Sequence, residues 1–133
     1  MARRLILDTG ALIAVERGLT ASSSFREEDD LAIAALTAAE FRVGIELADS
    51  PERARRRRQT LARFTAIAAV LGDTERTAAT HARLLAHVRR SGRSRGMHDL
   101  IIAAQAAEHG RVLVSPDLRA RFGDLPGVQS LAL

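Results

Sequence analysis

Short apolar runs alternate with helical segments along this chain, and no other feature limits its possible folds so strongly. Each apolar run has the length of a strand, and the segments between them carry apolar residues at helical spacing. The expected strands are 5–7, 31–36, 66–71, 112–114 and 128–133. The expected helices are 11–17, 37–48, 52–66, 73–90, 99–109 and 116–122. This alternation predicts an α/β fold: a parallel sheet of four or five strands with helices on both faces.

Length and composition further restrict the kind of protein that this chain can be. The 133 residues suit one domain, so residues 1–133 are expected to form a single unit, with the polar segment 22–30 as a loop or a short capped helix. Cysteine is absent, which excludes thiolate metal sites, cysteine nucleophiles and disulfide bonds. No run approaches the roughly 20 apolar residues that cross a bilayer, and the run 5–7 is too short for the core of a signal peptide. We therefore expect a cytoplasmic protein with no membrane partner.

The charge of the chain favours an anionic partner. The net charge is +4, and every basic residue other than histidine is an arginine. Because lysine is absent, the phosphate-binding loop of P-loop enzymes is excluded. Aromatic residues make up only 3% of the chain, without tryptophan or tyrosine, so base stacking on an aromatic platform is excluded as well.

Four acidic residues fall where a parallel sheet places its ligands. Asp8 follows the first expected strand and Asp117 the fourth, while Glu40 and Asp99 are expected in the first turns of helices. Ligands of such sheets bind beyond the carboxyl ends of the strands, where the chain order reverses. If the first and fourth strands are neighbours, all four carboxylates can converge. Their mutual repulsion calls for a cation, and hard oxygen ligands select Mg²⁺ or Mn²⁺, which can activate water and stabilise the charge on a phosphoryl group.

Each of these acids also has a structural interpretation. Asp8 and Asp117 could cap the helices that follow them, and Asp99 could interact with a helix dipole. Glu40 has the spacing of a capping box with Thr37. A cap can hold a ligand in place, so the two roles are compatible. The other acidic run is interpreted as solvated surface outside the site; it comprises Glu27, Glu28, Asp29 and Asp30.

Four motifs in register resemble those of one known family. They are residues 5–13, 37–40, 98–104 and 114–117, with Phe122 after the last. Together they resemble the PIN-domain family, and within it the VapC-like toxins. The order and spacing of the motifs extend over nearly the whole chain. The resemblance implies a sheet with its first strand central and a divalent-metal-dependent endoribonuclease that acts as the toxin of a toxin–antitoxin system.

The resemblance also assigns roles to individual residues. It implies a catalytic and metal-binding set of Asp8, Glu40, Asp99 and Asp117, holding Mg²⁺ for which Mn²⁺ can substitute, with Thr9 and Ser115 as supporting residues. The implied partners are an RNA substrate, a small cognate antitoxin, and a second copy of the chain within a larger toxin–antitoxin assembly. The antitoxin's tail is expected to lie in the active-site groove, against apolar residues such as Leu12, Ile13 and Phe41.

The arginines differ in how well they are placed for RNA. Arg93 and Arg95 lie just upstream of Asp99 and are assigned as substrate-binding residues. The stretch 53–58 is also basic, but its side chains would fan round a helix and form a solvated surface. His98 would point about 100° away from Asp99 on a helix, so it is not assigned as a catalytic base.

Two other classes of protein share part of this pattern. Residues 7–11 look like an aspartic-protease loop, but that class needs a β-rich fold with a flap, and the chain downstream has helical spacing. The stronger alternative is a catalytically silent PIN-like module that binds RNA or protein. A pure RNA binder would gain nothing from four carboxylates, which repel phosphate, and metal-dependent cleavage would separate the two interpretations.

Overall fold

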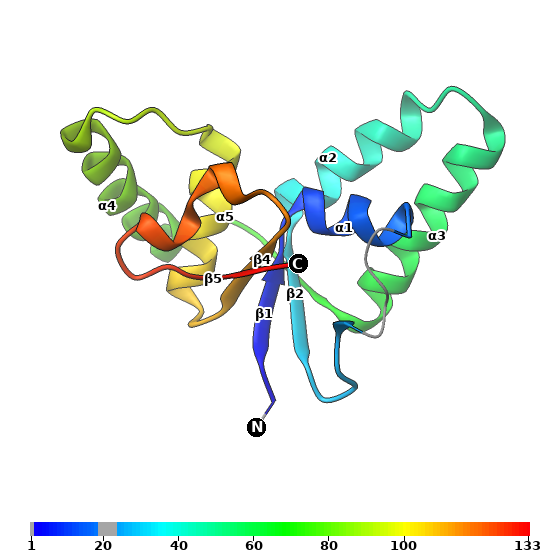
Figure 1. The fold of residues 1–133 in the computed structure, drawn as a ribbon, viewed down its shortest axis with the longest axis horizontal. Coiled ribbons are helices and arrows are strands. Elements are labelled where there is room, and N and C mark those ends of the chain that lie inside the picture. Colours follow the sequence, from blue (N-terminus) through cyan, green and yellow to red (C-terminus); the bar gives the residue numbers. More distant parts are fainter. Residues whose placement is uncertain (1, 19–23) are drawn as a thin grey trace.

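The computed structural model describes residues 2–18 and 24–133, and Figure 1 shows its arrangement of helices and strands. The strands are β1 (Arg4–Leu7), β2 (Asp30–Ala34), β3 (Ala69–Leu71), β4 (Val112–Ser115) and β5 (Gln129–Ala132). The helices are α1 (Thr9–Glu16), α2 (Ala35–Glu46), α3 (Pro51–Ile67), α4 (Glu75–Ser91) and α5 (Met97–Glu108), followed by the short 3-10 helices η2 (Leu118–Ala120) and η3 (Phe122–Asp124). The predicted alternation of strands and helices is confirmed.

All five strands are parallel, in the order β3-β2-β1-β4-β5. β1 is central, as the resemblance implied, and Leu7 pairs with Ile33 of β2 on one side and with Val114 of β4 on the other. The chain builds outward from β1 through β2 and β3 and then returns to the other side of β1 as β4. The switch in direction therefore lies between β1 and β4, the position at which parallel sheets bind ligands.

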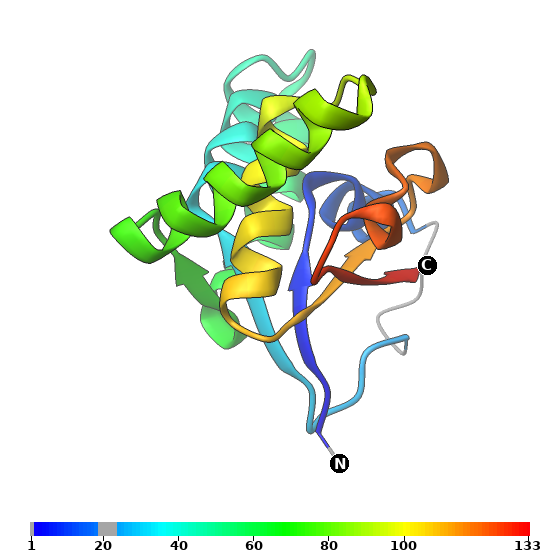
Figure 2. The same ribbon diagram turned by 90° about the vertical axis from the view of Figure 1, so that its left-hand side faces the viewer.

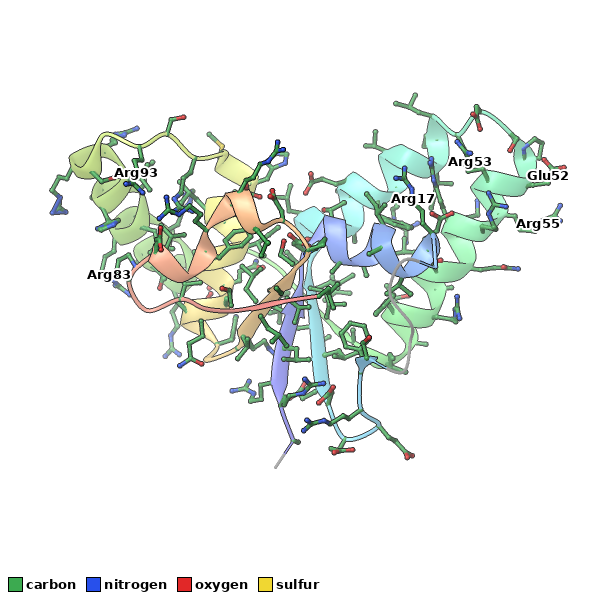
Figure 3. All side chains as sticks on the ribbon, in the orientation of Figure 1. Arg17, Glu52, Arg53, Arg55, Arg83 and Arg93 are labelled. Atoms are coloured by element: carbon green, nitrogen blue, oxygen red, sulfur yellow. The ribbon has the colours of Figure 1, made fainter. Side chains whose placement is uncertain are left out.

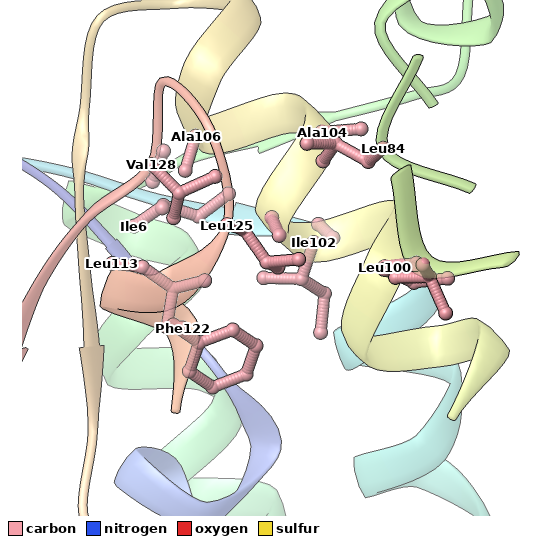
Figure 4. Packing of buried hydrophobic residues seen from close by; sticks show 14 residues of the cluster. Ile6, Leu84, Leu100, Ile102, Ala104, Ala106, Leu113, Phe122, Leu125 and Val128 are labelled. Atoms are coloured by element: carbon pink, nitrogen blue, oxygen red, sulfur yellow. The ribbon is translucent and has the colours of Figure 1, made fainter. Parts of the chain in front are cut away.

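Helices cover both faces of the sheet. Figure 1 shows α1, α2 and α3 on one side of the strands and α4 and α5 on the other, and Figure 2 shows α4 and α5 lying across the face nearer the viewer. Successive residues of a strand point to opposite faces: Leu5 and Leu7 pack in the core under α1 to α3, whereas Ile6 packs under α4 and α5. Figure 4 shows the second core, where Phe122 and Leu125 close over Leu113.

Helix α2 begins earlier than predicted, and the expected capping box is wrong. β2 ends at Ala34 rather than at residue 36, α2 starts at Ala35, and its N-cap has no side-chain hydrogen bond. Thr37 is therefore inside the helix, fully buried, with no partner for its hydroxyl. Glu40 lies in the second turn of the helix rather than the first. The capping box that the structure does contain is at α4, where Thr74 and Thr77 exchange hydrogen bonds.

Two other expectations need correction. Residues 116–122 do not form one helix: η2 and η3 are separated by Arg121, whose backbone is left-handed with φ 48°. Asp29 is not a freely solvated charge, because it accepts two hydrogen bonds from Arg3, Nε at 2.9 Å and Nη2 at 2.6 Å. Of the polar segment 22–30, residues 22 and 23 lie outside the described part, and residues 25–29 form neither helix nor strand.

A buried arginine forms hydrogen bonds between the strands at the end of the sheet opposite Asp8. The side chain of Arg111 is only 6% exposed, and its Nη1 donates to the carbonyl oxygens of Leu5 and Asp30 and to Oδ1 of Asp30. These contacts connect the start of β4 with β1 and β2. None of the helices in the described ranges combines the length and the apolar character needed to cross a membrane.

Candidate active site

Asp8 is the most enclosed of the four acids. Its backbone N–H donates to the carbonyl of Val114 at 3.2 Å, which fixes the end of β1 against β4. Its Oδ1 accepts the Ala11 N–H at 2.8 Å, so the residue caps α1. Burial raises the pKa of the Asp8 carboxyl, and the charges of Asp99 and Asp117 add to the increase, against hydrogen bonds from Ser115 and Ala11. Asp8 therefore caps α1, as one of its two sequence interpretations expected, and the cap leaves the predicted site role open to it.

Glu40 is held from two other helices. Thr9 Oγ1, at the start of α1, donates to Glu40 Oε1 at 3.1 Å. His98 Nδ1, in the first turn of α5, lies 3.3 Å from Glu40 Oε2. Both carboxylate oxygens thus have a partner. Thr9, predicted as a supporting residue, contacts Glu40. The contact of His98 was not predicted, because a helix places His98 away from its neighbour Asp99 and the sequence does not show that α2 lies beside it.

Asp99 lies in the first turn of α5, as predicted. Burial raises the pKa of the Asp99 carboxyl, and the charges of Asp117 and Glu40 raise it further, while Arg95 and His98 lower it. The influence of Asp117 on both Asp8 and Asp99 places the three carboxylates within electrostatic reach of one another.

Asp117 is exposed and is turned toward its own backbone. Its N–H donates to Ser115 Oγ at 3.0 Å, and its Oδ1 accepts the N–H of Arg119 at 2.9 Å, so that it caps η2. Ser115 is buried, and its hydroxyl lowers the pKa of the Asp8 carboxyl. The supporting role predicted for Ser115 thus has a structural basis: its hydroxyl accepts a hydrogen bond from the acid after β4 and influences the acid after β1.

The donor set of this site fits a divalent cation in its chemistry and charge. All four acids supply hard oxygen atoms, and two of them have pKa values raised by burial and by neighbouring carboxylates, which a bound cation would reverse. Across residues 2–18 and 24–133, however, no three acidic or histidine side chains have the spacing of a metal site. Binding of an ion would therefore require some of these side chains to rotate toward one another.

A glycine permits the close approach of the two loops that carry Asp8 and Asp117. A Cβ atom on Gly10 would lie 3.3 Å from Cγ of Pro116, tighter than an ordinary contact. Pro116 therefore packs directly on the first turn of α1, and the glycine after Asp8 allows it to do so.

The family model of the PIN domain matches residues 5–126. The chain belongs to the PIN-domain family. A chain of the crystal structure of VapBC-5 from Mycobacterium tuberculosis, described as a member of the VapBC family of toxin–antitoxin systems, is 27% identical, with 98% of each chain covered and a TM-score of 0.80. These matches confirm the resemblance to VapC-like PIN domains that was inferred from the sequence.

More distant structures share the fold. VapBC2 from Rickettsia felis, bound to a promoter DNA fragment, matches with a TM-score of 0.84 at 16% identity over 98% of each chain. FitAcB from Neisseria gonorrhoeae matches with a TM-score of 0.73 at 24% identity over 96% of each chain. No curated protein sequence matches the chain.

Two of the cavities that border the acids of this PIN domain differ in size and in the charge of their walls. One, of about 520 Å³, has Asp99 and Asp117 in its wall; its other lining residues are Arg93, Ser94, Arg95, Gly96, Arg119, Ala120 and Arg121. The other, of about 120 Å³, reaches from Thr9 and Glu40 to Ile13 and Phe41. Leu12 is completely buried in the core, so it does not line this groove as expected.

The predicted substrate-binding arginines, Arg93 and Arg95, both line the larger cavity, and both have contacts within the protein. Arg93 lies in the cavity wall, 4.0 Å from Asp124. Both terminal nitrogens of Arg95 donate to backbone carbonyls, those of Ala120 and Arg121. Arg119 and Arg121 also line this cavity and were not predicted; the signal in the sequence was their position shortly after Asp117.

Proposed function

We propose that this PIN domain is the toxin of a toxin–antitoxin system and cleaves RNA with a divalent cation held by Asp8, Glu40, Asp99 and Asp117. PIN-domain toxins of the VapC type are generally nucleases, and PIN-domain nucleases generally use divalent metals. The observation that carries the proposal is the mutual electrostatic influence of Asp8, Asp99 and Asp117 at the switch between β1 and β4. Carboxylates at a phosphate-binding position repel the phosphate unless a cation binds between them.

The burial and the contacts of each residue indicate its proposed role. Asp8 and Asp99 are the carboxylates that burial penalises most, so they gain most from a cation. Ser115 orients Asp8, and Thr9 and His98 hold Glu40. When bound, the metal supplies an activated water and neutralises charge on the phosphoryl group. Water as the nucleophile leaves a 5′-phosphate and a 3′-hydroxyl, and the 2′-oxygen of the RNA is not needed.

Cleavage assays with defined metal content test this chemistry. The purified chain should cleave RNA in Mg²⁺ or Mn²⁺ and lose activity in EDTA. Asp8→Asn and Asp99→Asn should each lower the rate on the order of 100-fold, whereas Asp49→Asn, at an exposed residue beyond the C-terminal end of α2, should not. Products ending in a 2′,3′-cyclic phosphate, or activity that survives the chelator, would rule out the mechanism. Mapping RNA 5′ ends after brief expression would identify the target.

The alternative is a PIN-like module that binds RNA or protein without cutting either. It predicts no metal-dependent cleavage and no effect of Asp99→Asn on toxicity. The burial of Asp8 and Asp99 speaks against it, because uncompensated buried carboxylates reduce stability and weaken phosphate binding.

The proposed partners follow from the relatives. VapBC-5 is described as a toxin–antitoxin system, and a complex from Klebsiella pneumoniae with a TM-score of 0.65 is described as a toxin–antitoxin complex. We infer a small cognate antitoxin, and a homodimer of this chain within the larger assembly. Co-expression with the neighbouring open reading frame, followed by purification and mass measurement of the complex, tests both.

A further inference from the structure

The structure assigns a second part to the proposed ribonuclease site. We propose that the cavity of about 520 Å³ beside Asp99 and Asp117 holds an RNA phosphate next to the one that is cut. Arg119 contacts this phosphate, and Arg95 acts as a positioning residue that holds the turn carrying Arg119. The inference rests on the proposed function, because it takes RNA as the substrate.

The composition of the cavity wall favours a phosphate. Four arginines line it, against two aspartates, and both aspartates belong to the acidic site. A strand entering the acidic site would otherwise meet only repulsion. The guanidinium group suits phosphate because its N–H groups match the spacing of two phosphate oxygens. The cavity is therefore continuous with the site and has the opposite charge.

Three of the four arginines already have partners, and one does not. Arg121 Nε lies 2.8 Å from Asp124 Oδ2, Arg93 Nη1 is 4.0 Å from the same oxygen, and Arg95 bonds to two carbonyls. Arg119 is exposed, and its guanidinium makes no hydrogen bond or ion pair within the described ranges. It is the arginine of this cavity that can take up a new anion without losing an existing contact.

The position of Arg119 is fixed through its backbone. Its N–H donates to Asp117 Oδ1 at 2.9 Å, and the Asp117 N–H donates to Ser115 Oγ at 3.0 Å. The Ser115 hydroxyl in turn lowers the pKa of Asp8. Two hydrogen bonds therefore connect Arg119 with Ser115, the residue that supports Asp8, so a phosphate on Arg119 would be held at a fixed position relative to the site.

Arg95 stabilises the other end of the same turn. Its guanidinium donates to the carbonyls of Ala120 and Arg121. Arg121 has φ 48°, a left-handed conformation that is unfavourable for a residue with a side chain. The two hydrogen bonds from Arg95 offset this cost and keep η2 beside the acids. Arg95 was predicted to bind substrate directly, whereas in this structure two of its N–H groups donate within the protein.

The basic helix α3 provides the matched control. Figure 3 shows Arg55 on α3 at one end of the molecule and Arg93 at the other. Arg55 is exposed, carries the same charge as Arg119 and does not line the cavity. Replacement of either arginine lowers the net charge equally, so any difference between the variants reports position rather than charge.

Fluorescence anisotropy with a labelled eight-nucleotide single-stranded RNA, in EDTA so that binding is measured without cleavage, tests the proposal. Arg119→Gln should weaken binding about tenfold, the effect of one charge-assisted hydrogen bond, and reduce the slope of log K against log salt by about 0.7. Arg55→Gln should change neither by more than about twofold. Arg95→Lys keeps the charge but not the paired bonds, so it should weaken binding while leaving the salt slope unchanged.

The outcomes separate this inference from the proposed function. Equal losses of RNA affinity in Arg119→Gln and Arg55→Gln would overturn the inference, and so would full affinity in Arg95→Lys. Either result would do so even if the parent chain cleaves RNA on a gel when Mg²⁺ is restored. A selective loss in Arg119→Gln without any cleavage by the parent chain would support the phosphate site and reject the nuclease. Circular dichroism of each variant shows whether the fold is retained.

Discussion

His98 Nδ1 lies 3.3 Å from Oε2 of Glu40, a contact that joins the first turn of α5 to α2 across the acidic site. The other oxygen of Glu40 accepts a hydrogen bond from Thr9. The carboxylate is therefore oriented from two helices rather than by its own. Residues that orient metal ligands commonly influence metal affinity as strongly as they influence rate.

His98→Ala should accordingly weaken the site without removing it. We expect cleavage to fall roughly tenfold at limiting Mg²⁺ and the Mg²⁺ concentration for half-maximal activity to rise, because Glu40 loses one of its two partners. Titration of activity with Mg²⁺ measures both. His87→Ala, at an exposed histidine of α4, is the control. A fall in rate that excess Mg²⁺ does not relieve would argue that His98 contacts the substrate instead.

Asp8→Asn should stabilise the metal-free protein at neutral pH. Burial raises the pKa of Asp8 above its ordinary value of 3.8, so the folded state holds this proton more tightly than the unfolded state. Stability from this group is present below about pH 4 and is lost as pH rises through the raised pKa. The melting temperature of Asp8→Asn in EDTA should thus equal that of the parent at low pH and exceed it at pH 7.

Mg²⁺ should reverse this order. A cation at a hundred times its Kd adds about 2.7 kcal/mol to the folded state, so the parent should gain several degrees in melting temperature and Asp8→Asn much less. Asp49→Asn should behave as the parent in both experiments. If Mg²⁺ stabilised Asp8→Asn as much as the parent, Asp8 would not be a metal ligand.

Asp29→Asn should have the opposite pH dependence. The hydrogen bonds from Arg3 lower the pKa of Asp29 to about 2, so its contribution to stability is present above about pH 4 and is lost as pH falls through about 2. The variant should melt a few degrees below the parent at pH 7, and the difference should shrink toward pH 2 and vanish below it. Glu27→Gln, in the same acidic run, should not change melting. Cleavage well below the melting temperature should be normal.

Arg111→Met should destabilise the sheet without affecting the site. Loss of the buried guanidinium removes its hydrogen bonds to the carbonyls of Leu5 and Asp30 and to Oδ1 of Asp30, at a cost of about 2–3 kcal/mol in the free energy of unfolding. Arg4→Met is the matched control, because Arg4 also pairs with Asp30 but its side chain is 52% exposed. Urea denaturation measures both; equal effects would show that the buried hydrogen bonds contribute little.

The sequence predicts the sheet because its local signals agree with the tertiary structure. Leu5, Ile6 and Leu7 are all buried, since helices cover both faces, and a continuous apolar run is the pattern of such a strand. Asp8 and Asp99 could be identified because each occupies a defined point, the end of β1 and the first turn of α5. Their roles came from the family resemblance, and the structure adds their burial and mutual repulsion.

The features that the sequence did not predict depend on partners far away in the chain. The pair of Arg3 with Asp29 spans 26 residues, and that of Arg111 with Asp30 spans 81. Residues 37–40 have the spacing of a capping box, yet β2 ends early enough for α2 to begin two residues before Thr37. Local spacing cannot decide this, because Thr37 is fully buried and the packing around it determines where the helix starts.

Antitoxin binding should depend on the same acids as cleavage. An acidic pocket attracts an arginine, which can pair bidentately with carboxylates and compete with the metal. The adjoining groove lined by Ile13 and Phe41 offers apolar surface for the residues that follow such an arginine. Asp8→Asn should therefore weaken the binding of the antitoxin tail peptide at least tenfold, and Mg²⁺ should weaken its binding to the parent, whereas Arg55→Ala should change neither. Calorimetry with and without Mg²⁺ measures these effects. Full inhibition by an antitoxin whose affinity is unchanged by Asp8→Asn and by Mg²⁺ would contradict this prediction. The antitoxin would then inhibit by binding another surface rather than by occupying the site.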